Sequence, residues 1–103
     1  MARLLRVTAA AEIPVGRART IEVDGARVAI FNAGDGRYHA LGATCPHEEG
    51  PLGDGIVVRG AAVCPWHGFD FDLRTGACGI DPELAAPVYP VRRDGADLLV
   101  ELP

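Results

Sequence analysis

The chain has 103 residues, of which 49% are hydrophobic and 23% charged, and its formal net charge is −4 at pH 7. This length is typical of one domain, and we take residues 1–103 as a single domain with a hydrophobic core of its own. The ten basic residues are scattered along the chain. The composition therefore excludes the dense basic face with which proteins bind nucleic acid.

The N-terminal residues do not have the pattern of a targeting segment or a membrane anchor. Arg3 and Arg6 interrupt the apolar run there, so the uninterrupted stretch of a signal peptide or a transmembrane span is missing. We therefore expect a cytoplasmic protein that does not bind membranes. Three cysteines cannot form a paired disulfide framework. In a reducing compartment, clustered Cys and His residues indicate metal or redox chemistry.

Short apolar runs separated by turn dipeptides fill most of the chain. One helical turn is predicted near residues 9–12, and Pro14 ends it. Dipeptides that favour tight turns separate the apolar runs, among them Asp24-Gly25 and Arg59-Gly60. Strands are predicted at residues 21–23, 28–31, 37–41, 56–58, 61–63, 88–93 and 97–102. Many short strands with regular turn signals predict an all-β fold, either an antiparallel sandwich or a small barrel.

Two similar segments carry the residues that are capable of metal or redox chemistry. The first is Cys45-Pro46-His47 and the second is Cys64-Pro65-Trp66-His67, with sixteen residues between His47 and Cys64. Each segment follows a predicted strand, so two loops would each offer one thiolate and one imidazole. These groups bind borderline and soft transition metals, and four of them suit a closed site. The sequence therefore predicts a metal centre held by Cys45, His47, Cys64 and His67.

The identity of the metal depends on the order of the four ligands. Two cysteines and two histidines also fit a structural zinc site in a non-redox module. Zinc fingers usually place both cysteines before both histidines, whereas here the order is Cys, His, Cys, His. This order suits a two-iron cluster in which the cysteines hold one iron and the histidines hold the other. Zinc remains the alternative at this point.

The double motif C-x-H and C-x-x-H resembles the signature of Rieske [2Fe–2S] ferredoxins and Rieske domains, and the similarity runs from about Leu4 to Leu102. The stretches that carry the resemblance are residues 40–47, 50–55, 64–68 and 71–76. The resemblance implies an all-β Rieske-like fold with a cluster-binding subdomain formed by two hairpin loops. It also implies one [2Fe–2S] cluster per chain, with Cys45 and Cys64 on the inner iron and His47 and His67 on the outer iron.

The chain departs from the respiratory branch of this family at several positions. The extra cysteines that tie the two loops together in that branch are replaced here by Glu49 or Gly50 and by Trp66. The Ser and Tyr whose hydroxyl groups donate to the cluster sulfurs are replaced by Phe69 and Phe71. Fewer donors to sulfur leave the reduced cluster less stabilised. We therefore expect a reduction potential near the low end of the Rieske range, about −150 mV.

The resemblance further implies a soluble one-electron carrier. It would take electrons from a flavin-containing NAD(P)H reductase and pass them to a terminal Rieske oxygenase. The sequence shows no nucleophile, acid–base pair or open metal position, so we expect no enzymatic activity from the chain alone. The alternative electron-transfer role is that of the small subunit of an assimilatory NAD(P)H nitrite reductase.

Three further residues attract attention but are interpreted as structural. We expect His39 to occupy an ordinary strand position before Leu41. Cys78 is interpreted as a small, semi-buried apolar residue rather than a redox-active thiol. For Trp66 we expect a packing role that covers the cluster.

Overall fold

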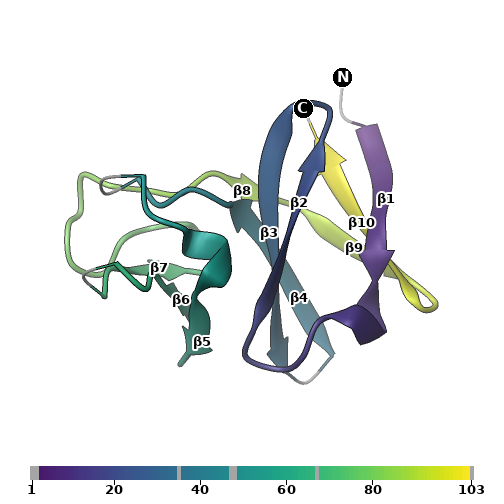
Figure 1. The fold of residues 1–103 in the computed structure, drawn as a ribbon, viewed down its shortest axis with the longest axis horizontal. Coiled ribbons are helices and arrows are strands. Elements are labelled where there is room, and N and C mark those ends of the chain that lie inside the picture. Colours follow the sequence, from purple (N-terminus) through teal and green to yellow (C-terminus); the bar gives the residue numbers. More distant parts are fainter. Residues whose placement is uncertain (1–2, 35, 47–48, 67, 103) are drawn as a thin grey trace.

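The computed structural model describes residues 3–34, 36–46, 49–66 and 68–102 (Figure 1). This part of the chain contains ten strands, two 3-10 helices and no α-helix. The strands are β1 (Arg3–Ala9), β2 (Ala18–Val23), β3 (Ala26–Gly34), β4 (Arg37–Gly42), β5 (Ile56–Val58), β6 (Ala61–Val63), β7 (Asp70–Asp72), β8 (Val88–Tyr89), β9 (Val91–Asp94) and β10 (Asp97–Leu102), and the helices are η1 (Ala10–Glu12) and η2 (Leu52–Asp54). The all-β prediction is confirmed, and η1 is the predicted helical turn.

The strands form three antiparallel sheets, in the orders β1-β10-β9, β2-β3-β4-β8 and β5-β6-β7. Figure 1 shows the four-stranded sheet between the other two. No helix among the described residues has the length and apolar character that crossing a membrane requires.

The middle sheet buries both of its faces, and this explains the continuous apolar run in β3. Val28 and Ile30 pack on one side, whereas Ala29 and Phe31 pack on the other, because successive side chains of a strand point in opposite directions. The first group, which we call the base core, contains Ala10, Ile13, Val28, Ile30, Ala40, Leu98, Val100 and Leu102. The second, the loop core, contains Ala29, Phe31, Leu41, Ala43, Cys45, Leu52, Ala62, Cys64, Phe71, Leu73, Cys78 and Ala86.

The turn dipeptides have the backbone conformation that their sequences predict. Asp24 and Gly25 have φ values of 50° and 82° and join β2 to β3. Arg59 and Gly60 have φ values of 51° and 77° and join β5 to β6. Both pairs therefore have the two left-handed residues of a tight two-residue hairpin turn. Asp tolerates this conformation well, whereas Arg does so at a cost of about 1 kcal/mol.

The prediction of one strand over residues 88–93 is wrong in its continuity. The segment forms two strands, β8 and β9, which pair with β4 and β10 in different sheets. Pro90 stands between them; it has no N–H to donate, and its carbonyl accepts the N–H of Glu101 at 2.9 Å. The chain therefore changes sheets at this proline. Two strands, β1 and β7, were not predicted.

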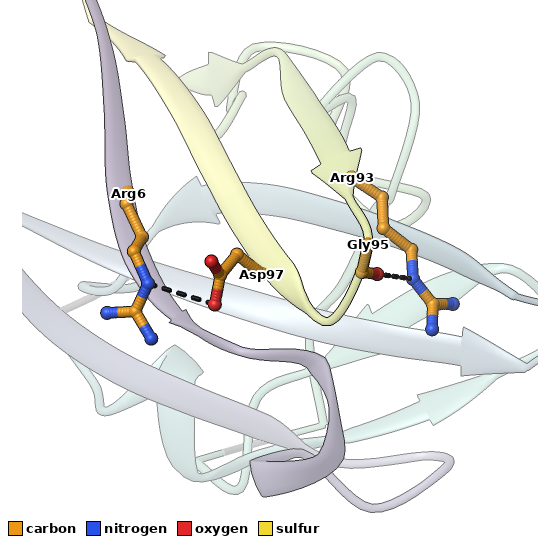
Figure 2. A network of polar contacts seen from close by, with 4 residues as sticks. All are labelled: Arg6, Arg93, Gly95 and Asp97. Atoms are coloured by element: carbon orange, nitrogen blue, oxygen red, sulfur yellow. Dashed lines mark hydrogen bonds and ion pairs between the residues drawn. The ribbon is translucent and has the colours of Figure 1, made fainter.

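Exposed polar contacts lie on the β1-β10-β9 sheet, which packs on the base core. Figure 2 shows Arg6 on β1 with its Nε 2.9 Å from Oδ1 of Asp97 on β10. It also shows the Nε of Arg93 donating to the carbonyl of Gly95 at 2.9 Å. Exposed pairs of this kind contribute at most about 1 kcal/mol each. The burial of Leu98 and Val100 therefore contributes more to holding this sheet in place.

Candidate metal centre

Each of the two cysteine loops is closed by an equivalent backbone hydrogen bond. In the first loop, which lies between β4 and η2, the N–H of Cys45 donates to the carbonyl of Gly50 at 2.7 Å. In the second, which lies between β6 and β7, the N–H of Cys64 donates to the carbonyl of Phe69 at 2.7 Å. Each bond spans five residues and begins at the cysteine. The sequence predicted two hairpin loops; the second lies in a hairpin, whereas an isolated bridge between Thr44 and Pro51 closes the first.

The loops also share a backbone conformation at the fourth residue after each cysteine. Glu49 has a φ of 56° and Gly68 has a φ of 70°. Both values are left-handed, and this conformation turns the chain back so that the next carbonyl can accept the cysteine N–H. Glycine adopts it without strain, whereas glutamate pays roughly 1 kcal/mol or more.

Gly50 brings the first loop against the sulfur of the second. A Cβ added at Gly50 would lie 3.0 Å from Sγ of Cys64 and 3.2 Å from both Cβ and Cδ2 of Trp66. Any side chain here would therefore push against the second cysteine or its neighbour. The absence of a side chain at Gly50 lets the two loops meet.

Both predicted cysteine ligands are fully buried. Cys45 and Cys64 have no exposed surface and belong to the loop core, together with Leu52 and Phe71. Buried thiols on two adjoining loops, each closed by a backbone hydrogen bond from its cysteine, fit the cysteine half of a Cys₂His₂ iron–sulfur site. The predicted ligands His47 and His67 lie outside the described residues, as does Glu48. Among the residues that are described, no three His, Cys, Asp or Glu side chains gather as a metal site.

Phe69 and Phe71 are the two residues expected to replace hydroxyl donors to sulfur, and they lie in or against the loop core. Phe71 is fully buried in the loop core, and it pairs with Ala62 of β6. Phe69 is half-buried and packs against the same core. Neither side chain carries a hydrogen-bond donor, so the prediction of a low reduction potential keeps its physical basis.

The three residues interpreted as structural all lie in the described part of the chain. His39 lies half-buried on β4, and burial followed by the positive charge of Arg37 lowers its pKa. Cys78 is more buried than expected, and its Sγ accepts the N–H of Asp81 at 3.4 Å. Trp66 is 48% exposed and packs on Gly50, so it lies over the meeting point of the loops.

Sequence reasoning missed the close approach of Gly55 to β6. A Cβ at Gly55 would lie 2.1 Å from the carbonyl oxygen of Val63, the residue that precedes Cys64. The only signal was the glycine-rich stretch of residues 50–55, in which the individual glycines look alike. A cavity of about 240 Å³ beside the first loop was also not foreseen. Its lining includes Glu49, Asp54 and Trp66.

Replacing Glu49 separates backbone strain from charge. We expect the E49N protein to unfold about 4 °C higher than the E49Q protein, because asparagine tolerates the left-handed conformation and both variants remove the same charge. Both should also have a slightly less negative reduction potential than the wild type, because a nearby negative charge opposes reduction. Thermal unfolding at one scan rate and a redox titration measure the two effects. Equal unfolding temperatures for the two variants would show that Glu49 is unstrained.

Comparison with known proteins agrees with this geometry. The Rieske [2Fe-2S] domain family matches residues 3–92. The biphenyl dioxygenase ferredoxin subunit of Pseudomonas sp. (strain KKS102) is 38% identical over 92 residues, which cover 87% of this chain and 84% of that protein. Apoptosis-inducing factor 3 of Homo sapiens is 41% identical over 61 residues, or 59% of this chain. The matched region spans only 10% of that protein's length.

Solved structures superpose on nearly the whole chain. A putative NADH-dependent nitrite reductase small subunit from Mycobacterium tuberculosis has a TM-score of 0.92 and 28% identity, covering 100% of this chain and 97% of that one. The ferredoxin of carbazole 1,9a-dioxygenase from Nocardioides aromaticivorans IC177 has a TM-score of 0.85 and 31% identity, covering 94% and 95%. The family match and the closed cysteine loops agree. This chain belongs to the Rieske [2Fe–2S] domain family.

Proposed function

We propose that this chain is a one-electron carrier whose [2Fe–2S] cluster is held by Cys45, His47, Cys64 and His67. The observation that carries the proposal is the pair of matched loops, each of which holds a fully buried cysteine whose backbone N–H closes the loop. The family match favours the iron–sulfur cluster over the zinc alternative. When bound, such a cluster supplies one-electron oxidation and reduction.

The residues around the cysteines suit this role in two ways. Leu52 and Phe71 exclude water from the cysteine side, because both are fully buried beside the two thiols. The outer side of the second loop is open, since Pro65 and Trp66 are exposed. Figure 1 shows the β5-β6-β7 sheet and the loops at the end of the molecule opposite β1 and β10. A partner can therefore reach this end without contacting the base core.

We infer that the electron donor is a flavin-containing NAD(P)H reductase and that the acceptor is a terminal Rieske oxygenase. Support comes from the biphenyl dioxygenase ferredoxin subunit. It also comes from the structure of an oxygenase–ferredoxin complex of carbazole 1,9a-dioxygenase, whose similar chain has a TM-score of 0.83 and 28% identity. NAD(P)H gives two electrons to the flavin and each carrier takes one, so two reduced carriers form per NAD(P)H.

Reconstitution tests this role directly. The holoprotein is mixed with NADH and the reductase of a biphenyl-type system, and reduction of the carrier is followed by its absorbance. Addition of the matching oxygenase and an aromatic substrate should then give substrate-dependent oxygen uptake. The C64A protein is the control and should carry no electrons. A holoprotein that is reduced by dithionite but supports no oxygen uptake would contradict the oxygenase role.

A second candidate function is the small subunit of an NAD(P)H nitrite reductase. The specific support is the TM-score of 0.92 with full coverage of this chain. The same preparation is therefore added to a nitrite reductase large subunit, and nitrite-dependent NADH oxidation is measured. Activity in this assay without oxygen uptake in the first would favour the nitrite role.

A further inference from the structure

A basic groove of about 330 Å³ separates the middle sheet from the β5-β6-β7 sheet. Its lining includes Arg37 and His39 of β4, Arg59 of the β5–β6 turn, Asp72 at the end of β7, and Arg74 in the turn that follows β7. We propose that this groove is a binding site for a small molecule that carries a phosphate-like oxyanion. The volume is at the small end of ligand pockets, which suits a small anionic compound better than a large cofactor.

Hydrogen bonds hold together two of the turns that line the groove. The N–H of Leu73 donates to the carbonyl of Gly60 at 3.0 Å and ties the β5–β6 turn to the end of β7. Oδ1 of Asp72 accepts the N–H groups of Arg74 and Thr75 at 2.7 and 3.0 Å. Arg59 and Arg74 therefore project from two turns that are held together, so less conformational freedom is lost when both bind one anion.

The charge in the groove has the opposite sign to the charge of the molecule. Among the described residues that line the groove, Arg37, Arg59 and Arg74 are positively charged and Asp72 is negatively charged, whereas the whole chain has a net charge of −4. Hydrogen bonds from backbone N–H groups lower the pKa of Asp72. Its carboxylate is therefore held in the turn by these bonds. The ion pairs found among the described residues, Arg6–Asp97 and Arg19–Glu12, lie outside the groove. Guanidinium groups arranged in this way are suited to bind the oxygens of phosphate or sulfate.

Arg59 occupies a backbone position that local structure does not favour for arginine. It has a φ of 51° at the first central position of the hairpin turn, where Asn, Asp or Gly is preferred. The equivalent position of the β2–β3 turn is Asp24, which is one of the preferred residues. A ligand-binding role would explain why a strained arginine, rather than a preferred residue, lies on the rim of the groove.

The surroundings of His39 are those of a positive site. Burial, then Arg37 and more weakly Arg74, lower the pKa of this imidazole, whereas Asp72 raises it. A bound anion would offset the repulsion by the two arginines and let His39 take up a proton. Binding is therefore expected to strengthen as the pH falls below neutrality.

The groove is separate from the metal centre. Arg59 and Gly60 lie at one end of the β5–β6 hairpin, whereas Cys64 follows β6 at the other end. The three residues of β6 span about 10 Å. An anion in the groove can therefore bind without contacting the cysteine loops.

The R59N variant tests the proposal because its two expected effects have opposite signs. Without sulfate, the variant should unfold at the same or a higher temperature than the wild type, because asparagine suits the left-handed position. Sulfate affinity of the holoprotein, measured by calorimetry at constant ionic strength with chloride as the balancing salt, should fall about tenfold because one charge-assisted hydrogen bond is lost. Inorganic phosphate should compete with sulfate.

The matched control is R92N, which removes an exposed arginine of β9 outside the groove. It should leave sulfate affinity unchanged, whereas R74Q should weaken binding as R59N does. Equal loss of affinity in R59N and R92N would overturn the proposal, because it would show nonspecific attraction. Absence of sulfate and phosphate binding to the wild type would also overturn it, and binding of an acidic protein alone would count against a small-molecule site.

Discussion

The C64A protein is expected to lose the red-brown colour, the acid-labile sulfide and the electron paramagnetic resonance signal of the reduced protein. C45A should do the same. Both thiols are fully buried on the closed loops, and an alanine in either place would remove one of the two thiolates proposed to hold an iron. The measurements are iron and sulfide content per chain, visible absorbance, and the spectrum after reduction by dithionite.

Cys78 provides the matched control. It is also a buried cysteine of the loop core, but it lies beyond β7 and its sulfur accepts the N–H of Asp81. The C78A protein should keep full iron and sulfide content and lose about 1 kcal/mol of unfolding free energy. If C78A lost the cluster and C64A kept it, the assignment of ligands would be wrong.

The sequence predicted the elements whose signals are local. Asp24-Gly25 and Arg59-Gly60 mark their hairpins because only a few residues tolerate two successive left-handed positions. The strands at residues 56–58 and 61–63 have the predicted bounds for the same reason. The two cysteines were proposed as a pair of ligands because each begins a short loop with Pro at the next position, and their ligand role stays a prediction.

Elements that depend on distant partners were not predictable. β7 has only three residues, Asp70–Asp72, and its single apolar side chain is buried because β6 lies beside it. β1 pairs with β10 from the opposite end of the chain, and its register shifts between Arg6 and Thr8. A pairing between such distant segments leaves no local pattern in the sequence. Likewise, the contact between Gly50 and the sulfur of Cys64 joins two loops that the sequence keeps apart.

A methyl group at Gly55 is expected to push β6 away from the first cysteine loop, and β6 leads directly into the second. In the G55A protein the new Cβ would lie 2.1 Å from the carbonyl oxygen of Val63 and 3.0 Å from that of Leu52. Both are backbone atoms, so no side chain can move aside. Gly55 has a φ of −78°, which alanine adopts easily, so the clash alone causes the effect.

We expect G55A to lose about 3 kcal/mol of unfolding free energy, which lowers the unfolding temperature by about 15 °C. Val63 directly precedes Cys64, so a shift of β6 also displaces a predicted ligand, and iron content should fall with stability. G60A is the control. Its Cβ would meet no atom within 4 Å, but its φ of 77° strains alanine, so it should lose only about 1 kcal/mol and keep its iron. The two effects are distinguishable by thermal unfolding and iron analysis of the same preparations. Equal stability of the two variants, with full iron in both, would mean that β6 and the first loop adjust freely, and the loops would then owe their geometry to the cluster rather than to the chain.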